Sequence, residues 1–303
     1  NPDSEVMVTV GGSEAIDIAL RAMCDPGDEV LIPQPSYVSY VPCTMLAGGK
    51  PVVIELEEKD NFKLTPEKLL AKITDKTKIL VMPFPNNPTG AIMTKEDLAP
   101  IVDIIIEKDL FVISDEIYSE LTYGTDHVTI AEFPGMKDRT ILINGFSKSY
   151  AMTGWRLGYA AAPHRILEQM LKIHQFAIMC APTTSQYAAV SALRDGDNDV
   201  QMMREAYDQR RRFVLHAFKE MGLDCFEPEG AFYAFPSIKR FGMTSDEFAT
   251  RFLREEKVAV VPGTAFGASG EGFLRVSYAY SLKNLKEALG RMANFVKRLD
   301  EER

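Results

Sequence analysis

The sequence predicts an α/β protein in which a mostly parallel sheet is covered by helices and is followed by a smaller α+β domain. Two observations lead to this prediction. Up to Leu193, short runs of β-branched residues alternate with helical patterns, as in sheets whose parallel strands are joined by crossover helices. Beyond Leu193 a long polar helix, isolated strands and a terminal helix follow. We therefore expect a large domain over residues 1–196 and a small domain over residues 197–303.

Four short segments rich in Val, Ile and Leu are predicted to be buried strands of the large domain. They are Glu29–Pro33, Lys78–Phe84, Leu110–Ser114 and Arg139–Asn144. The helices include Ser13–Cys24, which has one apolar face, and Thr94–Asp109, which starts with a capping threonine and an acidic first turn. Ligands of such sheets bind beyond the carboxyl ends of the strands.

The small domain is predicted to begin with a long helix from about Val200 to Met221, after a polar turn. Further strands and helices are expected at Gly230–Pro236, Ser245–Glu256, Val258–Pro262, Phe273–Tyr280 and from Leu282 to about Leu299.

Composition and charge exclude several classes of function. The chain has 46% hydrophobic and 25% charged residues and a net charge of -9, which is typical of globular proteins and unfavourable for binding nucleic acids or membrane surfaces. We expect no membrane span and no signal peptide. The four cysteines are far apart and are not grouped with the histidines, so we expect reduced thiols in a cytoplasmic protein and no metal site.

One lysine, Lys148, lies in a turn-like stretch of small residues with no other charge before Arg156. An isolated lysine is usually a solvated side chain. Its amine becomes a nucleophile, able to bond a carbonyl carbon, when burial or a neighbouring cation lowers its pKa. Arg156 offers a planar set of donors that suits phosphate.

Three other motifs offer groups for a ligand, each with a plainer alternative. Gly12 and Ser13 precede a helix, where free amides and the helix dipole favour phosphate, although Gly-Gly-Ser is also an ordinary helix cap. Asn87 follows a strand in a Pro/Asn-rich segment, which is either a turn or the source of an amide in a site. Asp115 closes an apolar strand three residues before Tyr118. It needs a cation or a strong donor as partner, unless it caps a helix.

These groups together would suit one ligand that carries a phosphate, an aldehyde for the lysine and a basic ring nitrogen for the aspartate. Pyridoxal 5'-phosphate has all three groups. We therefore predict that it is the cofactor.

The motifs GGSEA, PSY, NNPTG, SDEIY, GFSKSYAMTGWRLG and FLRVS occur in this order along the chain. This order resembles that of the class I/II aminotransferases, pyridoxal-phosphate enzymes of fold type I, over essentially the whole chain. The motifs are most similar to those of the bacterial aspartate and aromatic aminotransferases. The lysine motif is specific, since small residues before the lysine are followed by Gly-x-Arg-x-Gly.

The resemblance implies a role for each residue around the cofactor ring. Lys148 would bond to C4' of the cofactor and, once displaced, would move a proton between the substrate Cα and C4'. Asp115 would pair with the pyridine nitrogen. Tyr118 and Asn87 would hydrogen-bond to O3', and Tyr37 would stack on the ring.

The phosphate and the substrate carboxylate have their own predicted partners. The resemblance implies that Gly12, Ser13 and Arg156 hold the phosphate. Arg275 would bind the α-carboxylate of the substrate with two hydrogen bonds, and Asn87 would also contact the substrate.

The chain departs from the family pattern at two places. Many relatives have a phosphate-binding serine three residues before the lysine, where this sequence has Gly145; we expect Ser147 to substitute for it. The family also has a substantial N-terminal segment before the position of Asn1, which supplies pocket residues, and we expect such a segment to be missing from this sequence.

The resemblance implies transfer of an amino group from an aspartate-type, aromatic or alanine-type L-amino acid to a 2-oxo acid such as 2-oxoglutarate, in a homodimer. One alternative is a cystathionine-type β-lyase of the same fold, which would use the same lysine. Another is the cofactor-binding half of a transcription regulator, against which the acidic chain argues.

Overall fold

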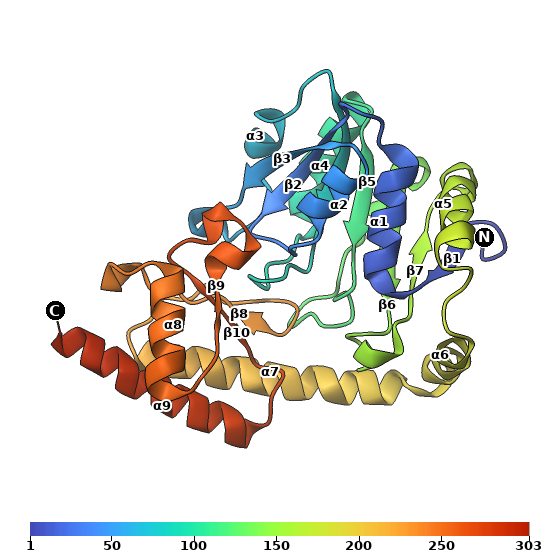
Figure 1. Ribbon diagram of the computed structural model, residues 1–303. Coiled ribbons are helices and arrows are strands. Elements are labelled where there is room, and N and C mark those ends of the chain that lie inside the picture. The colour runs from blue at the N-terminus through green and yellow to red at the C-terminus, as the bar shows by residue number, and fades with distance from the viewer. Residues whose placement is uncertain (303) are drawn as a thin grey trace.

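The computed structural model describes residues 1–302 and has two sheets of very different size (Figure 1). The large sheet has the strand order β1-β7-β6-β5-β4-β2-β3. Its strands are β1 (Val6–Thr9), β2 (Glu29–Gln34), β3 (Lys50–Glu55), β4 (Thr77–Met82), β5 (Phe111–Asp115), β6 (Thr140–Gly145) and β7 (Gly158–Ala161). The pairs from β3 through β2, β4 and β5 to β6 are parallel, and β7 runs antiparallel to both β6 and β1. The predicted mostly parallel sheet is thus confirmed.

Helices lie along the large sheet and around the small one. They are α1 (Gly11–Met23), α2 (Tyr40–Leu46), α3 (Pro66–Leu70), α4 (Lys95–Glu107), α5 (His164–Ala177), α6 (Thr183–Asp195), α7 (Asp197–Glu220), α8 (Ser245–Glu256) and α9 (Leu282–Glu301). The predicted start of α4 is confirmed, because Thr94 and the side chain of Asp97 form a capping box. None of these helices is long and apolar enough to cross a membrane.

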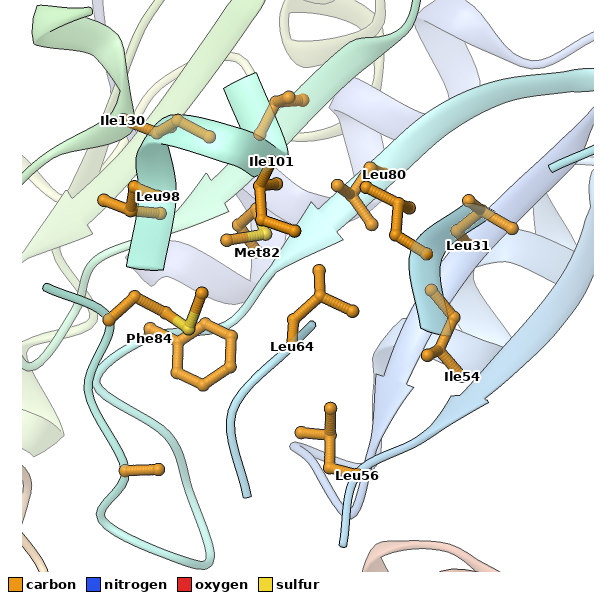
Figure 2. Packing of buried hydrophobic residues seen from close by; sticks show 14 of the residues in the cluster. Leu31, Ile54, Leu56, Leu64, Leu80, Met82, Phe84, Leu98, Ile101 and Ile130 are labelled. Atoms are coloured by element: carbon orange, nitrogen blue, oxygen red, sulfur yellow. The ribbon is translucent and has the colours of Figure 1, made fainter. Parts of the chain in front are cut away.

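The large sheet is buried on both faces because its strands alternate apolar side chains between two cores. On one face, Ile79 and Val81 of β4 pack with residues of α1, α2 and α5. On the other, Leu80 and Met82 pack with residues of α3 and α4, and Figure 2 shows them beside Ile101. The result is a three-layer arrangement of helix, sheet and helix.

The small sheet and its helices form a separate core. Its strands are β8 (Tyr233–Ala234), β9 (Val261–Pro262) and β10 (Leu274–Ser277), and they pair antiparallel in the order β8-β10-β9. Phe248 and Phe252 of α8 pack there against Phe295 of α9. The long helix α7 runs from α6 beneath the large sheet to this core (Figure 1). A domain boundary after residue 196 stays a prediction.

Several sequence-based boundaries need correction. The first helix begins at Gly11 rather than Ser13. The three strands of the small domain are shorter than their apolar runs, because strand ends depend on which backbone groups find a partner. Strands β1, β3 and β7 were not predicted, since short or partly exposed strands give a weak apolar signal.

Candidate active site

The ten residues singled out in the sequence all line one cavity of about 310 Å³. They are Gly12, Ser13, Tyr37, Asn87, Asp115, Tyr118, Ser147, Lys148, Arg156 and Arg275. A cavity of this size suits a small molecule. The structure therefore brings all of them together, although up to 263 positions separate them in the chain.

The parallel strands explain this convergence. Strands β4, β5 and β6 end at Met82, Asp115 and Gly145, and the segments after these ends carry Asn87, Tyr118 and Lys148. Because parallel neighbours end at the same edge of a sheet, these side chains meet there. Arg275 comes from β10 of the small sheet and closes the cavity from the other side.

One end of the cavity is formed by the N-terminus of α1. Ser13 lies inside the first turn of this helix, so the alternative that it caps the helix is wrong; Val10 is the cap residue and makes no side-chain cap bond. The first-turn amides have no partner within a helix and attract anions. A Cβ on Gly11 would lie 2.6 Å from Nη2 of Arg156, which shows how closely this guanidinium approaches the helix.

Lys148 lies in the turn after β6, half-buried beside aromatic rings. Its Nζ is 5.8 Å from the ring centre of Tyr118 and 5.7 Å from that of Phe232. Burial lowers the pKa of the Lys148 amine, and the cations Arg156 and Arg275 lower it further, against the opposite effect of Asp115. The amine is thus more readily deprotonated than a solvated lysine.

Asp115 is a buried acceptor at the end of β5. Its Oδ2 accepts a 2.7 Å hydrogen bond from the Tyr40 hydroxyl, and its Oδ1 accepts one from the amide of Ile117 at 3.3 Å. Burial raises the pKa of the Asp115 carboxyl. A turn follows this residue instead of a helix, so the alternative of a helix cap is wrong. A cationic ring nitrogen nearby would favour its charged form.

Arg275 is fixed at the opposite side of the cavity. Its Nη1 donates a 2.9 Å hydrogen bond to Oδ1 of Asn87. Its guanidinium carbon lies 4.5 Å from the ring centre of Tyr233 and 4.7 Å from that of Phe266. The Nε of Arg275 is buried and has no hydrogen-bond partner within residues 1–302. An incoming carboxylate would satisfy this donor.

The departure at Gly145 has a steric cause. A Cβ at this position would lie 2.8 Å from Cα of Gly158 and 3.0 Å from the carbonyl oxygen of Leu157. A serine therefore does not fit there without a backbone shift. Ser147 lines the cavity as expected, while its carbonyl accepts a hydrogen bond from Thr153; its role toward a phosphate stays a prediction.

Sequence reasoning did not single out seven further residues that line the cavity. They are Ile16, Tyr40, Pro83, Pro85, Ile117, Thr153 and Tyr233. Tyr40 lies three residues after Tyr37 in the same motif, and Tyr233 lies in a strand-like run read only for its apolar pattern. The hydroxyl groups of Tyr40 and Tyr233 were the only sign in the sequence of a role in the site. The fold shows that they contact Asp115 and Tyr118.

The cavity fits pyridoxal phosphate on three independent features. The start of α1 beside Arg156 is a cradle for an anion, Lys148 is an amine with a lowered pKa, and Asp115 is a buried acceptor that forms no ion pair with any residue of 1–302. No cluster of three or more metal-ligating side chains occurs within residues 1–302.

The chain has many relatives of known class. Residues 1–292 match the sequence model of a family described as aminotransferase class I and II. The chain is 51% identical to the putative aminotransferase YugH of Bacillus subtilis, covering 98% of this chain and 77% of that protein. It is 49% identical to an aspartate aminotransferase of Pyrococcus abyssi, over 96% and 76% of the two chains. The crystal structure of an aromatic aminotransferase from Pyrococcus horikoshii superimposes with a TM-score of 0.96 at 48% identity, over 98% and 81% of the two chains.

Proposed function

The chain belongs to the class I and II aminotransferases and is a pyridoxal-phosphate-dependent transaminase of fold type I, and from this premise we propose which residues act and on which substrates. The proposed reaction moves the amino group of an aromatic amino acid or of aspartate to a 2-oxo acid such as 2-oxoglutarate. The observation that carries the assignment of residues is the convergence of Lys148, Asp115, Arg156 and Arg275 on one cavity.

Lys148 is the proposed base. When bound, pyridoxal phosphate supplies an aldehyde that accepts the amino group and a ring that takes up the electrons released at Cα. The amine of Lys148, whose pKa is lowered by burial and by two arginines, would take the proton from the substrate Cα and deliver it to C4' of the cofactor, as transfer of the amino group requires. The start of α1 and Arg156 hold the phosphate, with Gly12 and Ser13 as amide donors.

Asp115 and Tyr118 are the proposed partners of the ring. Asp115 would pair with the ring nitrogen and keep it protonated, while Tyr40 fixes the carboxylate by a hydrogen bond to Oδ2. Burial raises the pKa of the Tyr118 hydroxyl well above its ordinary value, so Tyr118 acts as a neutral donor. Tyr37, which lines the same cavity, would stack on the ring face.

Arg275 is the proposed binding group for the α-carboxylate. Two aromatic rings and Asn87 hold its guanidinium, and its buried Nε has no hydrogen-bond partner within residues 1–302. The amide nitrogen of Asn87 is left to donate to the ring oxygen or the substrate, because its oxygen is engaged by Arg275.

The preferred amino donor is proposed to be aromatic, with aspartate second. Within residues 1–302, the cations that line the cavity are Lys148, Arg156 and Arg275, and each has a task with the cofactor or the α-carboxylate. A second carboxylate therefore has no cation of its own, whereas Tyr37 and Tyr233 offer apolar contact area. Both donor types occur in the names of similar proteins.

A homodimer is the proposed assembly. Large apolar side chains are exposed along residues 171–202, at the end of α5, on α6 and at the start of α7, and we call them the α5–α6 patch. The patch comprises Leu171, Phe176, Ile178, Met179, Tyr187, Val190, Leu193 and Met202. Apolar surface of this kind supports a contact between copies of the chain. The four free cysteines support a cytoplasmic location.

The function is tested by single-turnover spectroscopy of the cofactor-loaded protein. Adding tyrosine or aspartate without an oxo acid should convert the bound cofactor to its amine form once per site, and 2-oxoglutarate should restore the starting spectrum. Continuous release of pyruvate and ammonia from a cysteine-type substrate, without this exchange, would instead identify a β-lyase. A panel of amino donors then ranks the substrates by kcat/KM, and a preference for aspartate over every aromatic donor would contradict the proposed order.

A further inference from the structure

Tyr233 connects the two halves of the cavity. It lies in β8, where it pairs with Ser277 of β10, two residues from Arg275. Its side chain is 7% exposed and lines the same cavity as Tyr118, which follows β5 of the large sheet. This one side chain of the small sheet thus contacts both Arg275 of the small sheet and Tyr118, which follows a strand of the large sheet.

The hydroxyl of Tyr233 lies 3.1 Å from that of Tyr118. Both side chains are buried, so this hydrogen bond is not weakened by competing water. A tyrosine hydroxyl has one proton to donate and also accepts hydrogen bonds. When Tyr118 donates its proton to a group in the cavity, it can therefore accept the proton of Tyr233.

The ring of Tyr233 makes a second contact. The guanidinium carbon of Arg275 lies 4.5 Å from the centre of this ring and 4.7 Å from that of Phe266. Contact with two aromatic rings restricts the orientations of a planar guanidinium. The hydrogen bond to Asn87 then fixes its rotation within that plane. The hydroxyl and the ring of Tyr233 therefore serve different partners.

We propose that Tyr233 is a positioning residue that couples Arg275 and Tyr118. Arg275 is the proposed partner of the substrate carboxylate, and Tyr118 is a proposed partner of the cofactor ring. Its hydroxyl strengthens Tyr118 as a donor, and its ring holds Arg275 in the orientation for a carboxylate. This inference rests on the roles proposed above for Tyr118 and Arg275. The charged groups around the two hydroxyls are Asp115, Lys148 and Arg275.

Two substitutions in the cofactor-loaded protein separate the hydroxyl from the ring. Tyr233→Phe keeps the ring and removes the hydroxyl. A weaker donor at Tyr118 would make the Nζ of Lys148, when it is bonded to the cofactor, more basic, so the pH midpoint of the visible absorption should rise by up to about one pH unit, the effect of one neutral hydrogen bond. Affinity for a non-reacting dicarboxylate such as maleate should stay within about twofold, since the stacking contact remains.

Tyr233→Leu removes both contacts. It should show the same rise in the pH midpoint and, in addition, about 2- to 30-fold weaker binding of maleate, the range of a cation–π contact. Tyr207→Phe is the matched control, because Tyr207 packs against Phe232 but does not line the cavity. It should leave both readouts unchanged. Thermal denaturation of each cofactor-free variant reports on folding.

The outcomes are distinguishable from failure of the proposed function. If the wild-type protein exchanges amino groups but Tyr233→Phe leaves the midpoint unchanged, the coupling is overturned while the function stands. Equal binding of maleate by Tyr233→Leu and wild type would likewise overturn the role of the ring. A wild-type protein without amino-group exchange would refute the proposed function first.

Discussion

The reactivity of Lys148 comes from its neighbours rather than from the residue itself. A solvated lysine is protonated at neutral pH, whereas this amine is half-buried and shares a cavity with two arginines. Burial and the two positive charges destabilise its charged form and lower its pKa. The same surroundings leave room for a ligand to bond to it.

Lys148→Ala should abolish the visible absorption of covalently bound cofactor and reduce transamination by a factor on the order of 10⁴ or more, since both the bond and the base are lost. Absorption spectra and an assay of amino exchange measure this. Lys72→Ala removes an exposed lysine that does not line the cavity and should change neither. Full activity in Lys148→Ala would refute the assignment.

Asp115 should reduce the stability of the cofactor-free protein at neutral pH. Burial raises its pKa above the ordinary 3.8, so its contribution to the free energy of unfolding is greatest when the carboxyl is protonated, at low pH, and is lost as pH rises through the folded pKa. Asp115→Asn without cofactor should therefore be more stable than wild type at pH 7. The difference should shrink as the pH is lowered toward 4.

Urea unfolding between pH 4.5 and 8 tests this, with the exposed Asp126→Asn as control. The same Asp115→Asn variant should still bind cofactor but lose roughly 10²- to 10³-fold in turnover, as when one preorganised electrostatic partner is removed. Wild-type turnover would show that Asp115 has no part in catalysis.

At the scale of elements, the phosphate end depends on close packing of α1 against β7. A Cβ on Gly158 would lie 2.7 Å from the carbonyl carbon of Gly11 and 2.7 Å from the amide nitrogen of Gly12. The start of α1 therefore lies so close to β7 that position 158 has no room for a side chain. Glu14 of α1 also binds His174 of α5 at 2.7 Å, which fixes the helix from its other side.

Gly158→Ala should push the start of α1 away from β7, destabilise the protein by about 1–3 kcal/mol and weaken cofactor binding. Thermal denaturation and a fluorescence titration of the cofactor measure the two effects. Gly154→Ala is the control, because a Cβ there meets nothing within 4 Å. Equal cofactor affinity in the two variants would show that the packing does not form the phosphate site.

At the scale of the whole molecule, one exposed apolar surface and the division into two domains need explanation. The α5–α6 patch includes Phe176, Met179 and Tyr187, whose exposed fractions are 92%, 79% and 76%. We also propose the domain boundary after residue 196, because α7 begins at Asp197 and packs against both α6 and the small sheet. The cavity is lined by segments that follow strands of the large sheet and by Tyr233 and Arg275 of the small sheet.

Tyr187→Glu should convert a dimer to a monomer, because a charge in an apolar contact is costly to bury. Light scattering after gel filtration should give about twice the chain mass of 33.8 kDa for the wild type and the single mass for the variant. Leu70→Glu places the same charge on an exposed apolar residue outside the patch and should remain dimeric. A monomeric wild type would refute the dimer.

Much of the site was predictable because its residues have distinctive chemistry in distinctive motifs. Lys148, Asp115 and Arg275 are charged residues within segments of apolar or small residues, and each belongs to one of the ordered motifs. All three line the cavity. Tyr233 was not predictable in this way, since a tyrosine in a strand is common. Its function depends on Tyr118, 115 positions away, whose hydroxyl it meets.

The sequence by itself determined the class of fold, the cofactor and ten residues that line one cavity, because hydrophobic periodicity and motifs can be recognised along the chain. Only the tertiary structure decided which hydroxyl binds Asp115, why position 145 is a glycine and what holds Arg275. These are contacts between residues distant in the chain. Their distances follow from how strands and helices pack, which no local pattern encodes.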